Sequence, residues 1–259
     1  MPMLEKEDQS KDNIKGTILL VTPVWKDSSR LAVFGRELAN HLAGCEYNLE
    51  WMIADDGSGS DECNLLTLLH DELKETYPNM SLHFSDAHCG KGSVVREAWA
   101  QRPDANWYVF VDADGSLPPA ELTRVLDAGL ISNKTIMPIR KRTEHTHVDL
   151  TLPRRVFHQL FILAVRLIVA VRCADPQCGA KMLKGDDYRM VATSLLEVGL
   201  AFDTELLTAL SDNDIVWKEM PVTWIERDGG KVKPMRDAWG MLAALWNIRQ
   251  RQRAGKFKI

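Results

Sequence analysis

The first half of the chain alternates short, continuous apolar runs with longer amphipathic segments. The apolar runs cover residues 17–23, 49–54, 82–84 and 108–111, and runs of this kind are typical of strands that are buried on both faces. Between them, apolar residues recur every three or four positions, which is the spacing of a helix with one buried face. The pattern therefore predicts alternating strands and helices, and hence an open, mostly parallel sheet flanked by helices.

The helical segments have recognisable ends and faces. Ser28 or Ser29 can cap the first helix, and Gly44 can end it. The second helix is expected at residues 64–73, and a third is expected after Gly92. The predicted buried face of the second helix consists of Leu65, Leu68, Leu69 and Leu73.

The second half of the chain contains a further predicted strand and a long apolar segment. The strand covers residues 134–139 and leads into a polar, basic loop at 140–147. Residues 156–171 form a helix that is apolar around most of its circumference, with His158, Gln159 and Arg166 expected on one shared face. Two interpretations stand equally: a core helix, or an amphipathic helix lying in a membrane interface.

The C-terminal region combines an amphipathic helix with a basic tail. Apolar residues at helical spacing are Trp239, Leu242, Ala243 and Trp246. The tail carries Arg249, Arg251, Arg253, Lys256 and Lys258. This composition is typical of a membrane-surface anchor, although a C-terminal helix docked on the domain is the commoner case.

Composition and charge narrow the class of protein. The 259 residues suffice for one large α/β domain, and 45% are hydrophobic. A net charge of −4 excludes a globally basic nucleic-acid binder. Residues 1–15 are mostly polar and are expected to be a disordered lead, and no run reaches the ~20 apolar residues of a membrane span. We therefore expect a cytoplasmic protein whose five cysteines are reduced.

Paired acids follow two of the predicted strands. Asp55 and Asp56 come after the second strand, and Asp112 and Asp114 come after the fourth. The carboxyl ends of parallel strands meet along one edge, where such sheets bind ligands. Two carboxylates beside a glycine turn suit a divalent cation that is also held by phosphates. An Asp-rich turn explains either pair alone, but two pairs on one sheet favour a site.

Three further polar segments are candidates for binding or catalysis. Lys91, between two glycines and before a helix, can face an anion. Asp203 and Glu205 begin a helix, where acids are also stabilised by the helix dipole. Lys231 lies in a glycine-containing loop, from which it can reach a phosphate or simply be solvated.

Taken in order, these segments resemble the GT-A glycosyltransferases of family 2. Within that family, the polyprenyl-phosphate (dolichyl-phosphate) hexosyltransferases are most similar, and the resemblance covers residues 17–249. It rests on the segments Asp55-Asp56-Gly57-Ser58, Gly90-Lys91-Gly92, Asp112-Ala113-Asp114-Gly115, 175–181, 202–207 and 219–231. Each segment is a weak motif, and the six are specific because they occur together in this order.

The resemblance implies a role for each matching residue. Asp55 and Asp56 would contact the nucleobase and ribose of a nucleotide-sugar donor, with Lys91 nearby. Asp112 and Asp114 would hold Mg²⁺ or Mn²⁺ against the donor diphosphate. Gln177 would lie on the acceptor side, and Asp203 and Glu205 would face the sugar. The residues that would bind donor and acceptor phosphates are Arg140, Arg155 and Lys231.

The resemblance also implies a reaction. An inverting, metal-dependent transfer would move a hexose from a UDP- or GDP-sugar to a polyprenyl phosphate at the membrane surface. A lipid phosphate needs no general base, whereas a sugar hydroxyl does, with Asp203 or Glu205 as candidates. The first strand ends at Pro23, a predicted donor contact, but lacks the acid that usually follows in the family.

Other interpretations and the expected domain limits complete the predictions. A soluble or polysaccharide acceptor is the main alternative, and a nucleotidyltransferase or non-catalytic nucleotide-binding module is a further one. The expected glycosyltransferase domain covers residues 16–236, followed by the amphipathic helix and tail at 237–259. The protein is expected to be peripheral on the cytoplasmic face of a membrane.

Overall fold

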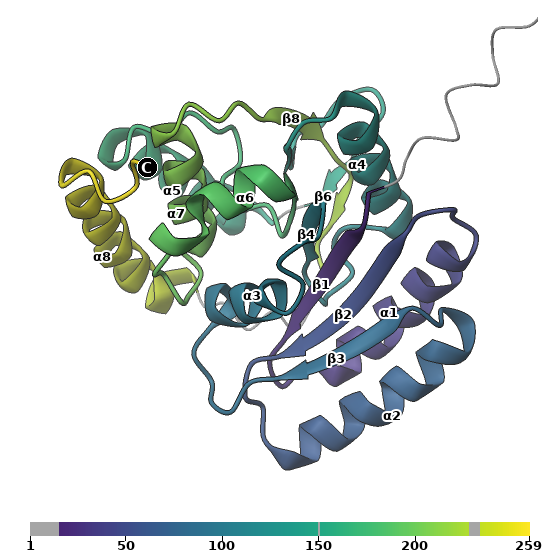
Figure 1. Ribbon diagram of the computed structural model, residues 1–259. Helices are drawn as coiled ribbons and strands as arrows, with labels where there is room; N and C mark the ends of the chain where they lie inside the picture. The colour runs from purple at the N-terminus through teal and green to yellow at the C-terminus, as the bar shows by residue number, and fades with distance from the viewer. Residues whose placement is uncertain (1–15, 150, 228–233) are drawn as a thin grey trace, which may run out of the picture.

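A seven-stranded sheet forms the centre of the protein (Figure 1). The computed structural model describes residues 16–149, 151–227 and 234–259. Within these residues, the strand order is β3-β2-β1-β4-β7-β5-β8, and β6 pairs with β9 in a small second sheet. The strands are β1 (Ile18–Val24), β2 (Leu49–Asp55), β3 (Met80–Phe84), β4 (Trp107–Val111), β5 (Ile136–Ile139), β6 (Val148–Asp149), β7 (Ala180–Lys184), β8 (Lys218–Pro221) and β9 (Trp224–Ile225).

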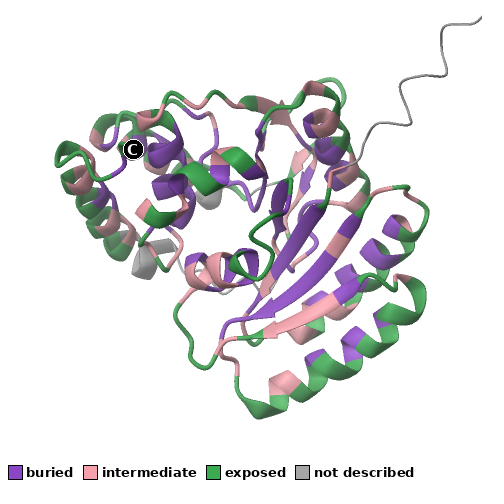
Figure 2. Ribbon diagram, viewed as in Figure 1, coloured by how far each residue is buried: buried purple, intermediate pink, exposed green. Residues whose placement is uncertain are grey.

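Helices cover both faces of the sheet, as predicted (Figure 1). They are α1 (Ser28–Ala43), α2 (Ser60–Thr76), α3 (Lys91–Ala100), α4 (Pro119–Ser132), α5 (Leu152–Ile168), α6 (Gly185–Val191), α7 (Phe202–Asp212) and α8 (Pro234–Arg253), with a 3₁₀ turn, η1, at Ala192–Ser194. Buried residues of α1, α2 and α4 pack on one face, and those of α3 and α5–α8 pack on the other. Figure 2 shows the resulting buried layer along β1, β2 and β4.

Strand β7 runs against its neighbours, and this reversal shapes the ligand-binding edge. The strands β3, β2, β1 and β4 are mutually parallel, whereas β7 pairs antiparallel with β4. The amino end of β7 therefore lies beside the carboxyl end of β4, with Ala180 opposite Val111. The loop that precedes β7 is thereby brought against the residues that follow β4.

Two details of the first strand and the second helix differ from the predictions. Strand β1 continues through Pro23 to Val24. The Val24 carbonyl accepts a hydrogen bond from the Asp56 N–H on the β2 side, so the backbone nitrogen of Pro23 faces the β4 side. Pairing with β4 has already ended at Val21, so the missing N–H of the proline breaks no hydrogen bond between strands. In α2 the buried residues are Leu66, Leu69, His70 and Leu73, and Leu65 and Leu68 are exposed.

Helix α5 differs from its prediction in both extent and orientation. It begins at Leu152 and ends at Ile168, because Ala170 adopts a left-handed conformation with φ 58°. His158 points inward, with its side chain 11% exposed, whereas Gln159 and Arg166 are exposed. The three residues therefore do not share one face, and the outward side of α5 is mainly apolar.

Glycine 92 allows helix α3 to approach helix α7 closely, which yields a stability prediction. A Cβ at Gly92 would lie 2.5 Å from the Phe202 Cβ and 2.6 Å from the Glu197 carbonyl oxygen. We expect Gly92→Ala to lower the free energy of unfolding by about 1–3 kcal/mol, the usual cost of overpacking. Urea unfolding monitored by circular dichroism measures this change.

A matched control is available in helix α8. Nothing lies within 4 Å of a Cβ built at Gly240, so Gly240→Ala should leave the free energy of unfolding unchanged or raise it slightly. Equal unfolding midpoints for Gly92→Ala and the unaltered protein would contradict the close packing of α3 on α7.

Candidate active site

Asp112 and Asp114 lie at the carboxyl end of β4, which is the position that the sequence predicts. The Asp112 N–H donates to the Gly179 carbonyl at 2.8 Å, so the loop before β7 is fixed against it. A Cβ at Gly179 would lie 2.2 Å from Asp112 Oδ2. Asp114 Oδ1 accepts from the Ser116 N–H at 2.9 Å, and its Oδ2 is 3.7 Å from Arg30 Nη1. Both carboxylates are therefore held in place and partly exposed.

Two lysines and two acids form a compact ionic cluster at this edge. Lys91 Nζ lies 2.8 Å from Asp112 Oδ1 and 3.6 Å from Asp203 Oδ2. Lys181 Nζ lies 2.9 Å from Asp203 Oδ1 and donates to the Cys178 carbonyl at 3.1 Å. Four elements that are distant in the sequence, α3, β4, β7 and α7, thus meet at one point.

Burial and charge oppose each other within this cluster. Burial raises the pKa of Asp112 above its ordinary value, and the Lys91 ammonium partly offsets that shift. Burial alone would lower the pKa of Lys91, but Asp112 and Asp203 outweigh it and raise the pKa above the ordinary value. Lys91 therefore stays charged, and the cluster is a set of mutually compensating ions.

Asp55 and Asp56 are buried and bound to their own neighbourhood. The Asp56 carboxylate accepts from the Cys89 and Gly90 N–H groups and lies 2.8 Å from His88 Nδ1. Asp55 is fully buried and accepts from the Ser58 N–H at 2.9 Å. Asp56 thus shapes the loop before α3, and the predicted donor contacts of both acids stay predictions.

An aromatic pair lies beside these acids. The rings of Trp25, after β1, and His88, before α3, stack with centroids 4.1 Å apart and an interplanar angle of 14°. The His88 side chain is 46% exposed. The segments that follow β1 and β3 therefore present two stacked aromatic rings beside these acids, and the sequence analysis did not predict this stack.

A second buried ion pair braces the loop before β7. Arg140 makes two hydrogen bonds to the Asp175 carboxylate, at 2.7 and 2.9 Å, and donates to the Gln177 carbonyl at 3.3 Å. His158 Nε2, from α5, lies 3.5 Å from Asp175 Oδ1. Arg140 is thus engaged inside the protein, and its predicted contact with a phosphate stays a prediction.

The remaining predicted residues are spread around the site. Arg155 is exposed on α5, and Gln177 Nε2 lies 3.9 Å from the Met241 sulfur of α8. Glu205 is fully buried, accepts from the Leu196 and Glu197 N–H groups, and pairs with Arg251. Those contacts suit a positioning residue better than a general base. Lys231 lies outside the described residues.

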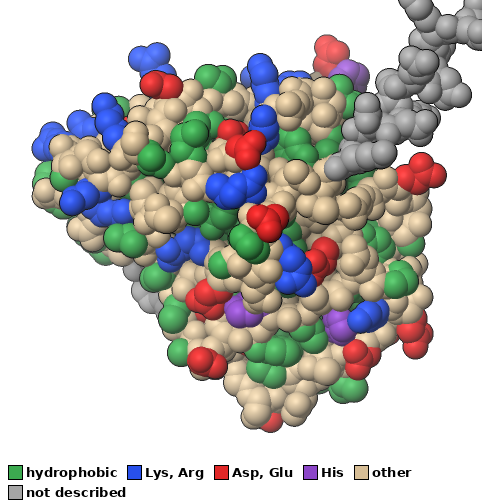
Figure 3. All heavy atoms as spheres, viewed as in Figure 1, with side chains coloured by type: hydrophobic (Ala, Val, Ile, Leu, Met, Phe, Trp, Pro, Cys, Tyr) green, Lys and Arg blue, Asp and Glu red, His purple; other side chains and the backbone are tan. Residues whose placement is uncertain are grey.

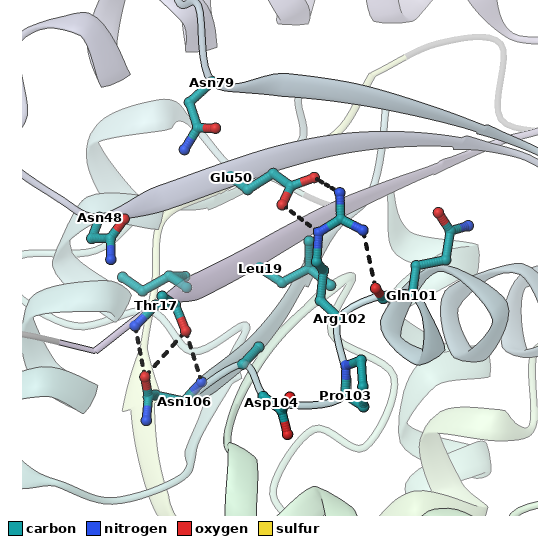
Figure 4. A pocket seen from close by; sticks show the side chains of 12 residues that line it. Thr17, Leu19, Asn48, Glu50, Asn79, Gln101, Arg102, Pro103, Asp104 and Asn106 are labelled. Carbon is teal, nitrogen blue, oxygen red and sulfur yellow. Dashed lines mark hydrogen bonds and ion pairs between the residues drawn. The ribbon is translucent and has the colours of Figure 1, made fainter.

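A separate hollow lies at the opposite, amino edge of the sheet (Figure 4). Its lining comes from the amino ends of β1 and β2 and from residues that precede β1–β4, with Glu50 and Arg102 paired at 2.8 Å. Asp104 is an exposed residue of this lining. This hollow contains none of the predicted site residues.

Comparisons with known proteins indicate the class of enzyme. No family model matches the chain. A dolichyl-phosphate beta-glucosyltransferase of Dictyostelium discoideum is 25% identical over 269 residues, covering 100% of this chain and 81% of that protein. Its Saccharomyces cerevisiae counterpart is 24% identical over 272 residues, covering 97% of this chain and 79% of that protein. The chain is therefore a glycosyltransferase.

This glycosyltransferase has the same fold as a solved structure of another protein. That structure is Mycobacterium tuberculosis glucosyl-3-phosphoglycerate synthase in complex with Mn²⁺, UDP and glucosyl-3-phosphoglycerate, with a TM-score of 0.63 and 14% identity. The match covers 98% of this chain and 87% of the synthase. The predicted GT-A architecture is confirmed, whereas the predicted membrane-interface helices stay a prediction.

The donor set of the glycosyltransferase fits a divalent cation that shares its shell with a ligand. Among the described residues, no group of three or more His, Cys, Asp or Glu side chains could hold a metal ion. Asp112 and Asp114 supply two hard oxygen donors one residue apart. Such a pair suits Mg²⁺ or Mn²⁺ when phosphate oxygens complete the shell. The metal assignment of these two acids remains a prediction that the chemistry supports.

Lys181 is the main site residue that the sequence analysis did not single out. It is 1% exposed, and its ammonium group holds Asp203 in place. It is the last residue of segment 175–181 of the family resemblance, so its place in that motif could have marked it as a site residue. Its burial could not be predicted, because lysine side chains are rarely fully buried.

The Arg140–Asp175 pair yields a prediction for stability and its pH dependence. Arg140 is chiefly responsible for lowering the pKa of Asp175 to about 2, against the cost of burial. Because this pKa is depressed in the folded state, the stabilisation is complete above about pH 5 and is lost as the pH falls towards 2. Asp175→Asn should cost about 3–5 kcal/mol near pH 7, since it leaves Arg140 buried without its partner.

Urea unfolding of both proteins at several pH values measures this effect. The difference in the free energy of unfolding should shrink as the pH falls below 4. An unchanged difference between pH 7 and pH 3 would show that the pair contributes no linked stability. Asp104→Asn, at the exposed rim of the opposite hollow, is the control for loss of one acid.

Proposed function

We propose that this glycosyltransferase moves a hexose, with inversion, from a nucleoside-diphosphate sugar to a polyprenyl phosphate. The names of the curated relatives state a dolichyl-phosphate acceptor and a beta-glucosyl product. The observation that carries the proposal is the state of Asp203. Two ammonium groups lie 2.9 and 3.6 Å from its carboxylate, so Asp203 is not a free general base, and this favours an acceptor that is already an anion.

On the donor side, Asp112 and Asp114 would hold Mg²⁺ or Mn²⁺. When bound, the ion would neutralise the negative charge that develops on the leaving nucleoside diphosphate. Lys91 adds a second positive charge directly beside Asp112. The stacked rings of Trp25 and His88 provide a flat surface for the nucleobase. UDP in the related synthase structure supports a uridine donor.

On the acceptor side, a phosphate oxygen attacks the anomeric carbon as the bond to the diphosphate breaks. No proton need leave that oxygen, so catalysis rests on positioning. Lys181 and Lys91 orient Asp203 towards the sugar. Arg155, exposed on α5, and Lys231 are the cations proposed for the acceptor phosphate. The Arg140–Asp175 pair fixes the loop against which the acceptor lies.

The location of a lipid acceptor is supported by two neighbouring helices. Helix α5 exposes one apolar stripe, formed by Leu152, Val156, Leu160, Leu163 and Leu167. Helix α8 exposes Trp239 and Trp246, at 79% and 56%. The two helices contact each other, and lysines and arginines gather at the end of the molecule formed by α8 (Figure 3).

We therefore propose that α5 and α8 lie on an anionic membrane surface. Exposed apolar and aromatic side chains beside basic residues are the composition of interfacial helices. Within the described residues, no helix is both long and apolar enough for a membrane span. The cytoplasmic face remains our prediction.

A transfer assay tests the proposed reaction. UDP-glucose, GDP-mannose and other nucleotide sugars are offered with polyprenyl phosphate, with and without Mn²⁺, and the lipid-linked sugar is measured. We expect product with one donor, and a loss of at least about 10²-fold in Asp114→Asn because transition-state charge is left uncompensated. Asp104→Asn, at the opposite edge, should keep full activity.

The same assay distinguishes the alternative acceptor. Turnover on a small soluble acceptor such as 3-phosphoglycerate, with none on polyprenyl phosphate under any donor, would contradict the lipid assignment. That acceptor is chosen because the related synthase was solved with phosphoglyceric acid. Full metal-dependent activity in Asp114→Asn would contradict the assignment of the metal site.

Vesicle sedimentation tests the membrane surface. The double variant Trp239→Ala/Trp246→Ala should bind vesicles containing anionic lipid at least about tenfold more weakly, because two large apolar side chains no longer enter the interface. The control is Ile131→Ala/Val216→Ala, which removes exposed apolar residues from α4 and from the segment before β8. Equal sedimentation of the Trp variant and the unaltered protein would contradict docking through α8.

A further inference from the structure

The charge balance of the active site is unusual for a site that must hold a divalent cation. Asp112, Asp114 and Asp203 would together attract such an ion strongly. However, Lys91 and Lys181 cancel two of these three negative charges, and Arg30 is shared between Asp114 and Asp27. A metal ion that arrives alone therefore meets only a weakly negative site.

The two lysines differ in how firmly they are held. Lys181 is 1% exposed and donates to the Cys178 carbonyl as well as pairing with Asp203, so it is a fixed part of the fold. The Lys91 side chain is 15% exposed and contacts Asp112 Oδ1 directly. Its ammonium also lies 4.4 Å from the Phe110 ring centroid. Lys91 thus occupies an oxygen that a metal ligand must offer, and its side chain is less completely buried than that of Lys181.

The backbone around Lys91 fixes where its side chain begins. Lys91 is the first residue of α3, and Gly90 before it has φ 122°. A Cβ at Gly90 would lie 2.6 Å from the Val198 carbonyl oxygen. Asp56 also holds the Gly90 N–H. These contacts hold the backbone at Gly90, so the lysine side chain is the part with most freedom to change its contact with Asp112.

We propose that Lys91 is a tethered cation that keeps Asp112 occupied until the diphosphate of the donor arrives, so that metal and nucleotide bind together. This inference rests on the proposed function. The incoming diphosphate brings at least two negative charges and offers Lys91 new oxygen acceptors. Asp112 Oδ1 is then released, and the site becomes negative enough to hold the ion. Free metal binds weakly, and the metal–nucleotide pair binds tightly.

The test measures Mn²⁺ binding directly, from the electron paramagnetic resonance signal of free Mn²⁺. Lys91→Met and Lys91→Gln remove the charge and keep a side chain of similar length. Without nucleotide, both variants should bind Mn²⁺ at least about tenfold more tightly than the unaltered protein, since one charge at this range has that much effect. Lys91→Arg, which keeps the charge, should bind Mn²⁺ as weakly as the unaltered protein.

Lys74→Met is the matched control, because Lys74 is exposed on α2, away from the ionic cluster. It should bind Mn²⁺ like the unaltered protein. In the unaltered protein, addition of UDP or GDP should tighten Mn²⁺ binding at least tenfold, and this gain should be much smaller in Lys91→Met. Thermal unfolding confirms that each variant is folded before titration.

One outcome would contradict the role of Lys91 alone, and another would contradict the proposed function as well. If the unaltered protein binds Mn²⁺ with UDP, but Lys91→Met and Lys91→Gln bind free Mn²⁺ no more tightly than the unaltered protein, Lys91 does not guard Asp112. The inference then fails while the proposed function stands. If Mn²⁺ does not bind even with UDP or GDP present, the metal site and the proposed function fail together.

Discussion

The contact between two lysines and two aspartates at the carboxyl edge of the sheet organises the whole site. Lys91 and Asp112 come from α3 and β4, and Asp203 and Lys181 come from α7 and β7. Lys181 and Asp203 are buried, Lys91 and Asp112 are partly buried, and each charge has an opposite charge within about 4 Å that offsets the cost of its burial. The elements must therefore pack closely enough to bring these groups together, and Gly92 and Gly179 provide that room.

The reversed strand β7 gives the site its second half. Because β7 runs antiparallel to β4, the loop before it reaches Asp112, and Gly179 accepts the Asp112 N–H. Arg140 and Asp175 brace that loop from β5, and His158 extends the brace to α5. The inward side of α5 thus supports the active site, while its outward side stays apolar and exposed. A single helix links the site to the surface proposed for the membrane.

Features that depend on the local pattern of apolar residues could be predicted from the sequence, whereas features that depend on strand pairing and ion pairing largely could not. Strands, helices and the position of Asp112 and Asp114 follow from apolar runs, which report burial directly. The direction of β7 does not, because a short strand reads the same both ways. The internal partners of Asp56 and Arg140 could not be predicted, because whether a charged side chain faces a ligand or an internal partner depends on long-range contacts, here with His88 and Asp175. The ligand roles expected for these two residues stay predictions.

The buried pair of Glu205 and Arg251 explains why the outer helices have a defined position. Arg251 lies near the end of α8, pairs with Glu205 of α7 and donates to the Ser194 carbonyl. Leu245 and Ile248 of α8 are fully buried on the same side. Asp203 lies two residues before Glu205, so the same short helix holds the ionic cluster and anchors α8. Trp239 and Trp246 are consequently carried on a helix whose placement is fixed by the active-site helix. A lipid acceptor that enters along α5 and α8 would therefore meet the sugar at a set distance from the surface.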